Sequence, residues 1–340
     1  MNHACRGLPR PVARGTLRRS VLAVLAALAV AGAGAAQAQP GDAAGSLWGT
    51  ASVDSLAATA AYVGIAQCVE CHDTIADKFE PNPHHNAHVD SHPAGTTVQC
   101  ESCHGPGSLH VEAAGDEKDP KFYAIRSFHH MKPADEAAVC RACHVNGEQV
   151  HWDQSSHARN DVPCQACHSI HDAKSEGGKF LLREARATQL CVTCHSDKRT
   201  ELAHTAHMPL REGGMDCSDC HNPHGSIGPH MIRGVSNNEL CTKCHMDKRG
   251  PMLWEHPPVR ENCLTCHDPH GSLHPRMQIA KQPRMCQQCH DEARHPTQPY
   301  SDATSAPEFF PNSRMFDRGC VNCHSQIHGS NHPAGMRFLR

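Results

Sequence analysis

The chain has 340 residues, among them 21 Cys and 31 His, whereas aromatic residues make up only 4%. Leu, Ile, Val and Phe supply 52 residues, about 15% of the chain and below the roughly 20% at which chains tend toward disorder. This composition excludes an ordinary α/β enzyme, and the mean hydropathy of -0.54 excludes a polytopic membrane protein. The abundance of Cys and His indicates a prosthetic group that is bound many times and supplies the missing core.

Residues 1–38 have the pattern of a secretory signal peptide. They contain five Arg, no acidic residue, an apolar stretch from Val21 to Val30 and a small-residue site ending at Ala38. We expect cleavage there, with a retained anchor as the alternative, and a flexible lead-in over residues 39–67, which are rich in Ala, Gly, Ser and Thr. Without the leader the chain keeps 27 basic and 35 acidic side chains, a net charge of -8. This charge does not indicate a protein that binds nucleic acid.

Ten copies of the pentapeptide Cys-x-x-Cys-His follow, and they contain every Cys beyond residue 38. The His after each second Cys favours covalent haem attachment over zinc sites or disulfides, which make no such demand. Two thiols one helical turn apart can add to the two vinyl groups of a haem, and the adjacent imidazole then binds the iron from one face. The predicted attachment residues for ten c-type haems are Cys68, Cys71, Cys100, Cys103, Cys140, Cys143, Cys164, Cys167, Cys191, Cys194, Cys217, Cys220, Cys241, Cys244, Cys263, Cys266, Cys286, Cys289, Cys320 and Cys323. The predicted iron ligands within the motifs are His72, His104, His144, His168, His195, His221, His245, His267, His290 and His324.

The motifs repeat in pairs, because every second one is followed by a variant of one phrase, as in CHNPHGS from Cys220 and CHDPHGS from Cys266. Residues 68–340 are therefore predicted to form a decahaem domain of five di-haem units. The units are residues 68–110, 140–171, 191–224, 241–270 and 286–328. Gly and Pro interrupt nearly every link, and no strand pattern occurs. We predict a multihaem cytochrome c fold, mostly irregular with short α-helices such as one within residues 179–190, no substantial sheet, and an extended haem-packed core.

Each unit has an opening and a closing motif, one closing histidine after the closing motif, and at least one intervening histidine between the motifs. One closing and one intervening histidine in each of five units give ten candidates. This number matches the ten irons, each of which needs a second ligand on the face opposite its motif histidine. The predicted second ligands are His85, His110, His157, His171, His207, His224, His256, His270, His295 and His328, with His84, His88 and His92 competing with His85. His224 follows His221 by three residues, and side chains at that spacing share one face of a helical turn. We therefore expect a closing histidine to bind a haem other than the one attached beside it.

About 30 residues for each haem are too few to separate the haems from one another, so we expect a chain of close haems through which electrons pass. Two His ligands close both axial positions of an iron, which then passes electrons but binds no substrate. The sequence therefore predicts an electron-transfer protein without catalytic residues.

Three stretches match known text beyond the motifs themselves: DKRGPMLWEHPPVRENCLTCHDPHGS from Asp247, CSDCHNPHGS from Cys217 and GCVNCHSQIHGSNHP from Gly319. Through them, residues 62–340 resemble the periplasmic decahaem c-type cytochromes of the MtrA and DmsE type, including their PioA and MtoA relatives. The resemblance implies second ligands at the ten histidines named above. It also implies a haem wire inside an outer-membrane β-barrel porin, which joins periplasmic or inner-membrane electron carriers to an outer-surface multihaem cytochrome or reductase. Because the chain beyond residue 38 has no long apolar segment, crossing a membrane would require such a sheath.

Two other functions stay open. One is a freely diffusing periplasmic electron shuttle that resembles the pentahaem donors of nitrite reductase. The other, less favoured, is a multihaem reductase, which would need an iron with an open face or a Lys in place of a motif His. No motif is altered in that way.

Overall fold

The computed structural model describes residues 56–85, 87, 97–290, 318–333, 335 and 338. The chain divides into two units, residues 1–49 and 50–340, and every described residue belongs to the second. The predicted signal peptide, residues 39–55 of the predicted lead-in, His88, His92 and His295 lie outside the described residues.

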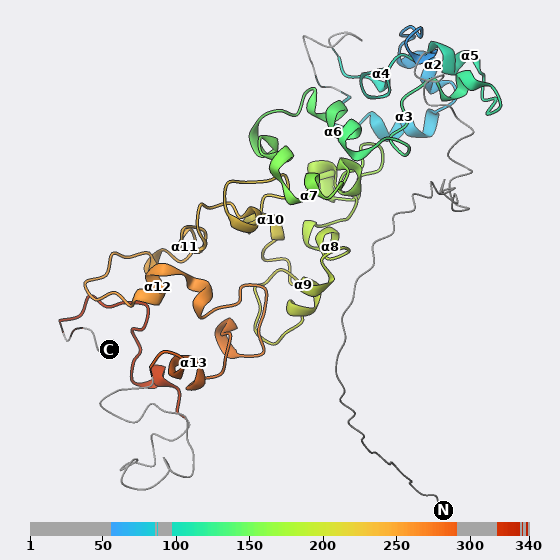
Figure 1. The fold of residues 1–340 in the computed structure, drawn as a ribbon. Helices are drawn as coiled ribbons and strands as arrows, with labels where there is room; N and C mark the ends of the chain where they lie inside the picture. The colour runs from blue at the N-terminus through green and yellow to red at the C-terminus, as the bar shows by residue number, and fades with distance from the viewer. Residues whose placement is uncertain are drawn as a thin grey trace, which may run out of the picture. The chain divides into compact units, whose positions relative to one another are not determined.

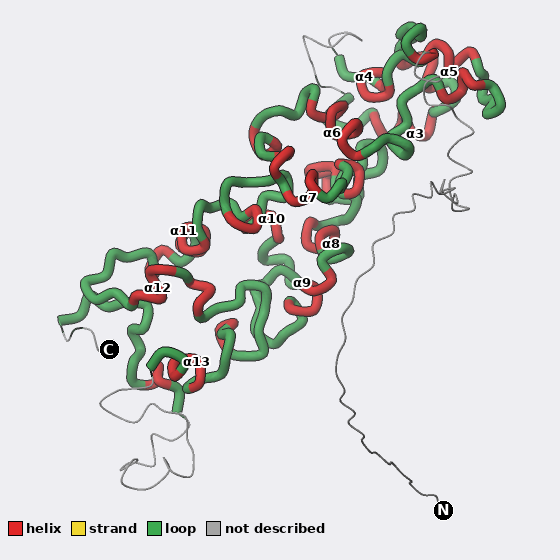
Figure 2. The backbone as a smooth tube through the Cα atoms, viewed as in Figure 1, coloured by secondary structure: helices red, strands yellow, loops and turns green. Residues whose placement is uncertain are grey.

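Short helices joined by loops make up the described part of the chain (Figures 1 and 2). The α-helices are α2 (Ile65–Val69), α3 (Asp73–Phe79), α4 (Cys100–His104), α5 (Ser108–Glu112), α6 (Pro133–Arg141), α7 (Ser156–Arg159), α8 (Ala187–Cys191), α9 (Ser196–Glu201), α10 (Cys217–Cys220), α11 (Asn237–Thr242), α12 (Pro257–Glu261) and α13 (Arg284–Gln287). The 3₁₀ helices are η1 (Pro120–Tyr123), η2 (Gly147–Gln149), η3 (Trp152–Gln154), η4 (Cys164–Ala166), η5 (Glu176–Leu181), η6 (Pro229–Met231), η7 (Met246–Lys248), η8 (Cys263–Thr265), η9 (Pro275–Met277) and η11 (Cys320–Asn322).

Isolated bridges, and no strands, pair the backbone within the described ranges. The predicted class, a multihaem c-type fold of short helices without a substantial sheet, is confirmed. None of the described helices has the length and apolar character needed to cross a membrane.

The motifs take two different positions in these helices. The first Cys of each opening motif lies at the end of an α-helix, in α2, α6, α8, α11 and α13. The first Cys of each closing motif instead begins a helix, in α4, η4, α10, η8 and η11. Side chains just before the closing motifs cap three of these helices, α4, α10 and η8. Asp216 forms a capping box with Asp219, and Asn262 accepts from the backbone N–H of Leu264 at 3.0 Å.

Each motif closes into a single helical turn. The His amide donates to the carbonyl of the first Cys of its motif, at 3.0 Å from His72 to Cys68 and at 2.8 Å from His324 to Cys320. This turn places both thiols and the imidazole of a motif beside one another. The geometry that haem attachment requires is therefore local to the pentapeptide.

The apolar core is thin. Among the described residues, the buried apolar side chains are Phe79, Val98, Ala113, Ala124, Ala137, Trp152, Leu181, Leu202, Leu210, Ile232 and Met285. Polar side chains are buried in nearly equal number, and the two most completely buried large ones are Glu136 and Ser155. Large apolar residues such as Ile227 and Phe180 stay 75% and 69% exposed. Because burial of apolar area is the main favourable term in folding, these side chains do not supply an adequate core by themselves.

The helix predicted within residues 179–190 forms only from Ala187 onward, as α8. Before it, Gly177, Gly178, Phe180 and Leu181 all have positive φ and break η5 into turns. The turn that follows the closing motif determines the backbone before Ala187.

Glu101, inside the closing motif of unit one, is 4% exposed and holds two loops to helix α4. Its carboxylate accepts from the backbone N–H groups of Val63 at 3.0 Å, Gly64 at 2.8 Å and Gly107 at 2.8 Å. We predict that Glu101→Ala leaves these donors without an acceptor, at about 1–3 kcal/mol each. The melting temperature of the haem-loaded protein should therefore fall by roughly 6 °C or more.

Thermal unfolding followed by circular dichroism checks this prediction. Glu112→Ala is the matched control, because Glu112 makes an exposed ion pair with Lys121 at 2.8 Å and should melt close to the wild type. Equal melting temperatures for the two variants would contradict the role given to Glu101.

Candidate haem sites

The cysteines of successive motifs lie near one another. Within each unit the first cysteines of the two motifs lie close enough to interact electrostatically. These pairs are Cys68 with Cys100, Cys140 with Cys164, Cys191 with Cys217, Cys241 with Cys263, and Cys286 with Cys320. Between units, the second cysteines lie close enough to interact electrostatically. These pairs are Cys103 with Cys143, Cys167 with Cys194, Cys220 with Cys244, and Cys266 with Cys289. No disulfide joins these cysteines in the described part of the chain. The motifs thus form one unbroken series, in the order of the sequence.

The ring of each closing histidine lies nearly parallel to the ring of a motif histidine elsewhere in the chain. The ring centroids are 6.3 Å apart for His110 and His72, 6.1 Å for His171 and His104, 5.9 Å for His224 and His168, 6.1 Å for His270 and His221, and 6.2 Å for His328 and His267. The planes of each pair are within 14° to 16° of parallel. From unit two onward, the partner is the closing motif of the preceding unit. His224 thus faces a motif other than its own, in agreement with the three-residue spacing.

These pairs fit one iron each. A metal binds an imidazole nitrogen at about 2.0 Å, and the ring centroid lies about 1 Å behind that nitrogen, so two axial imidazoles have centroids roughly 6 Å apart. Rings in direct face-to-face contact would lie closer, at about 3.5 to 4 Å. The observed separations therefore have the length that two imidazoles bound to one iron would require.

Intervening histidines approach opening motifs of the following unit. His256 lies 6.1 Å from His290 with planes 22° apart, and His157 lies 6.2 Å from His195 with planes 59° apart. The Nδ1–H of His157 donates to the carbonyl of Pro223 at 2.8 Å, which ties it to the segment carrying His224. The sequence repeats did not indicate that ring pairs would cross unit borders in both directions.

In unit one the structure brings His84, and not the predicted His85, next to a motif histidine. The centroids of His84 and His144 are 5.8 Å apart, with planes at 68°. Asn82 orients His84 by accepting from its backbone N–H at 2.9 Å and from Nδ1 at 3.0 Å. His85 contacts Phe79 edge-on at 5.5 Å. Two adjacent imidazoles give no sequence signal that would separate them, although Asn two residues before His84 is a local turn former.

His207, the predicted ligand of unit three, is held by two other groups. Its Nδ1–H donates to the carbonyl of His204 at 2.6 Å, and its Nε2 lies 3.2 Å from Oε1 of Glu212. His204 in turn donates from Nδ1 to the carbonyl of Gly271 at 3.2 Å. The predicted ligand His295 falls outside the described residues.

Backbone carbonyls fix the closing-motif imidazoles. Nδ1–H donates from His104 to Arg126, from His168 to Phe180, from His221 to His230 and from His267 to Arg276, at 2.7 to 2.9 Å. Such a bond fixes the tautomer and leaves Nε2 free to bind a metal, as is typical of metal-bound histidine.

Three of these carbonyls come from strained turns. His168, His221 and His267 form isolated bridges with Leu182, Ile232 and Gln278. The two residues before each bridge partner have φ between 50° and 59°; they are Phe180 and Leu181, His230 and Met231, and Arg276 and Met277. Left-handed backbone at residues other than Gly costs about 1–3 kcal/mol and tends to occur at functional sites. In each turn, the first strained residue supplies the carbonyl that orients the motif histidine.

Burial lowers the pKa of six of the paired imidazoles. Loss of contact with water is the largest cause at His104, His168, His171, His270 and His328, and it brings His224 to about 4, with a further contribution from His168. These rings are therefore neutral near pH 7, which is the form that binds a metal.

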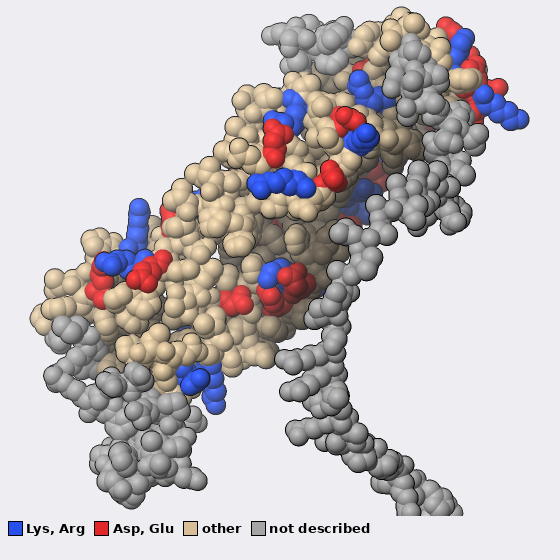
Figure 3. Space-filling model, viewed as in Figure 1, with Lys and Arg blue, Asp and Glu red and all other residues tan. Residues whose placement is uncertain are grey.

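The surface carries charges of both signs. On the face drawn in Figure 3, Lys and Arg side chains lie next to Asp and Glu side chains, without a broad patch of one sign. Pairs such as Arg141 with Asp153 and Arg260 with Glu255 contribute to this pattern. That face lacks the basic stripe of a nucleic-acid-binding protein.

Two protein families match the chain. The family described as "Doubled CXXCH motif" matches residues 157–200, 207–250 and 256–295. The family described as "Cytochrome c554 and c-prime" matches residues 50–105 and 108–169. Each doubled-motif match begins at an intervening histidine and ends just beyond the next opening motif.

Two curated relatives span different shares of the chain. "Multiheme cytochrome MtrA" of Shewanella baltica is 38% identical over 281 residues, which cover 82% of this chain and 81% of the relative. "Cytochrome c-type protein NrfB" of Escherichia coli O6:H1 is 28% identical over 141 residues, 40% of this chain and 67% of the relative. The first alignment is long and similar enough to establish kinship.

Proposed function

Because the chain belongs to the MtrA family of multihaem cytochromes, we propose that it carries ten haems in one series and conducts electrons across the outer membrane. The chain binds haem c through its Cys-x-x-Cys-His motifs, and it is an electron-transfer protein and not an enzyme. The observation that supports the conduit proposal is that the cysteines of successive motifs, from Cys68 to Cys320, lie close enough to interact electrostatically, in the order of the sequence.

We assign the iron ligands by one rule with an exception at each end. A closing histidine binds the iron of the preceding closing motif, and an intervening histidine binds the iron of the following opening motif. The first unit has no predecessor, so His110 serves its own opening motif, and the last unit has no successor, so His295 serves its own closing motif. The proposed pairs are His72 with His110, His104 with His171, His144 with His84, His168 with His224, His195 with His157, His221 with His270, His245 with His207, His267 with His328, His290 with His256, and His324 with His295.

The assignment of His207 rests on the repeat. Residues 157–200, 207–250 and 256–295 match one doubled-motif family in the same frame, with an intervening histidine first and an opening motif near the end. Since His157 and His256 lie beside the opening-motif histidines of their segments, the same position predicts that His207 serves His245. Its contact with Glu212 would give way on binding.

On a bound haem, these residues would occupy both axial positions of the iron. Bound haem supplies one-electron oxidation and reduction, and the two imidazoles exclude a substrate from the metal. The backbone bonds at Nδ1 of four closing-motif histidines would hold these imidazoles in place between oxidation states, which would limit reorganisation during transfer.

We further propose a periplasmic protein associated with the outer membrane through a porin sheath. Electron carriers of the periplasm or inner membrane would meet one end, and an outer-surface multihaem cytochrome or reductase the other. The MtrA relationship and the net charge of -8 beyond residue 38 support a polar wire that needs a protein sheath. The signal peptide at residues 1–38 remains part of this proposal.

The partial match to NrfB favours a second candidate, a periplasmic shuttle that diffuses between partners. It covers less than half of this chain, whereas the MtrA match covers most of it. The conduit therefore has the stronger support.

We predict that the chain and its porin, reconstituted together in sealed liposomes, reduce an enclosed redox dye when an impermeant reductant is added outside. Liposomes with the porin alone, and liposomes to which the chain is added without a porin, are the controls and should leave the dye oxidised. Absorbance of the dye gives the rate. A complete complex that leaves the dye oxidised would favour the shuttle instead.

A further inference from the structure

An ion pair accompanies three of the closing histidines. Lys198 and Lys248 occupy the same place in the sequence HxDKR, which begins at the His of two opening motifs. Each lysine lies close enough to the closing histidine of the next unit to interact with it electrostatically. These pairs are Lys198 with His270 and Lys248 with His328. Each Lys is paired with a carboxylate. Lys198 lies 2.8 Å from Glu201, and Lys248 lies 2.7 Å from Asp247.

His224 has an equivalent pair of different origin. Arg233 lies 2.8 Å from Glu148, and both interact electrostatically with His224. A base and an acid thus recur beside His224, His270 and His328, although the residues that supply them differ. The recurrence indicates a function tied to the closing histidine and not to one stretch of sequence.

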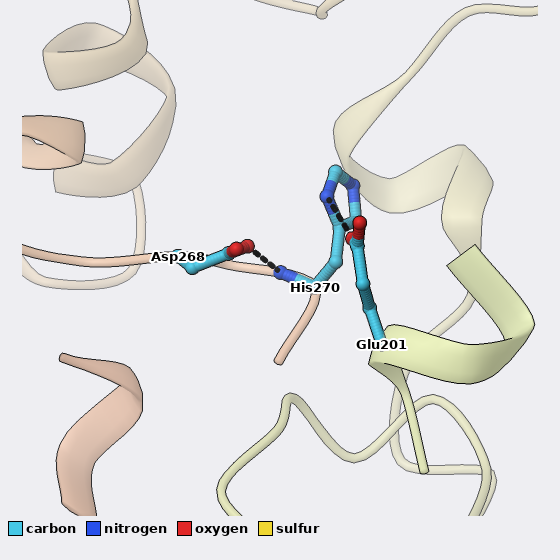
Figure 4. Close-up of side chains that lie close together, drawn as sticks. All are labelled: Glu201, Asp268 and His270. Atoms are coloured by element: carbon cyan, nitrogen blue, oxygen red, sulfur yellow. Dashed lines mark hydrogen bonds and ion pairs between the residues drawn. The ribbon is translucent and has the colours of Figure 1, made fainter. Parts of the chain in front are cut away.

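The geometry is clearest at His270 (Figure 4). Glu201, the last residue of α9, places Oε2 3.7 Å from Nδ1 of His270. Asp268 holds the backbone of the same residue, because its Oδ1 accepts from the N–H of His270 at 3.1 Å. The His270 ring lies 6.1 Å from His221, with planes 15° apart.

Other second-ligand imidazoles have an uncharged partner at the same atom. Nδ1–H donates to the carbonyl of Phe122 from His110 at 2.6 Å, and to the carbonyl of Pro223 from His157 at 2.8 Å. A carboxylate at this position differs from a carbonyl because it brings a full negative charge to within a few ångströms of the ring.

Glu201, Asp268 and His270 do not form a cation site of their own, although their ligand atoms lie within 4.8 Å of one another. The ammonium of Lys198 lies 2.8 Å from both carboxylate oxygens of Glu201. A positive charge is therefore already in place where a metal ion would bind.

We propose that Lys198 and Glu201 set the reduction potential of the haem attached at Cys217 and Cys220, which Glu201 lowers and Lys198 raises. This proposal rests on the proposed function, because it requires His221 and His270 to bind that iron. A nearby carboxylate makes the imidazole more basic and favours oxidised iron, which carries one more positive charge, whereas a nearby ammonium favours reduced iron. The pair thereby adjusts one member of the series without changing its ligands.

The test compares Glu201→Gln with Lys198→Met in the haem-loaded full-length protein. Potentiometric titration, followed by electron paramagnetic resonance, measures the reduced-to-oxidised ratio of each haem at a fixed ambient potential. For one haem this ratio should rise about tenfold in Glu201→Gln and fall about tenfold in Lys198→Met. A tenfold change corresponds to 59 mV for a one-electron couple. His270→Ala identifies the component, because it converts that haem to high spin.

Glu184→Gln is the matched control. It removes the same charge from an exposed ion pair with Lys174, at 3.8 Å, and should leave all potentials unchanged. Unchanged potentials in both test variants, or shifts of the same sign, would overturn the proposal, because a loss of structure alone has no reason to reverse sign. A wild-type spectrum without low-spin haem having two His ligands would overturn the proposed ligation itself, so the two failures are distinguishable.

Discussion

A chain in which Cys191, Cys194, Cys217 and Cys220 are all replaced by Ala should fail to accumulate as a folded protein. The two motifs carry His195 and His221, whose rings pair with His157 and His270 and so connect unit three to both neighbouring units. Without covalent haem these connections are lost, and the free energy of metal-ligand bonds that orders the chain is lost with them. The described apolar core is too thin to compensate.

Immunoblotting of periplasmic fractions and limited proteolysis of any product measure the effect, which we expect to be a fall below detection. Cys5→Ala is the control, because Cys5 belongs to no motif and should leave the yield unchanged. A variant that lacks the two haems and yet resists protease as the wild type does would show that side chains alone order the fold.

The local part of the site could be predicted from the sequence because it lies within one helical turn. The spacing of the pentapeptide predicts the turn from Cys68 to His72, and the hydrogen bond that the His72 N–H donates to the Cys68 carbonyl shows it. The three residues from His221 to His224 likewise predict that the two rings serve different irons, and His224 lies beside His168. Neither inference needs the path of the rest of the chain.

The partners of the histidines could not be predicted, because they depend on how long loops return. His224 lies far along the chain from His168, and no local pattern indicates that a closing histidine reaches back by one unit while an intervening histidine reaches forward. In unit one, His84 and His85 are adjacent and chemically identical. Only the placement of Asn82 and Phe79 separates them.

The turns after the closing motifs were also hidden from the sequence. Phe180, His230 and Arg276 adopt left-handed backbone that their residue types disfavour, and the helix expected within residues 179–190 gives way to one of these turns. In this conformation each of these residues directs its backbone carbonyl at a motif histidine, and the hydrogen bond formed there compensates for the disfavoured backbone. A propensity for local structure carries no information about such a requirement.

His224→Ala should produce one high-spin haem in an otherwise low-spin protein, and that haem should be the one attached at Cys164 and Cys167. The half-buried ring of His224 lies 5.9 Å from His168 and 6.2 Å from Trp152, so its removal should take away the second ligand of that iron and no other. Electron paramagnetic resonance of the oxidised protein counts the high-spin iron, and structure determination of the variant locates it.

His230→Ala is the matched control for this change. His230 belongs to the turn after the same closing motif, but its contribution to His221 is a backbone carbonyl, which Ala retains. All haems should stay low-spin in this variant. Carbon monoxide should bind to His224→Ala at about one site for each molecule and to His230→Ala at none, because only the first opens an axial position. If the altered haem in His224→Ala were the one attached at Cys217 and Cys220, the proposal that closing histidines bind the iron of the preceding unit would be wrong. The connection between neighbouring units would then have to come from contacts other than iron ligation.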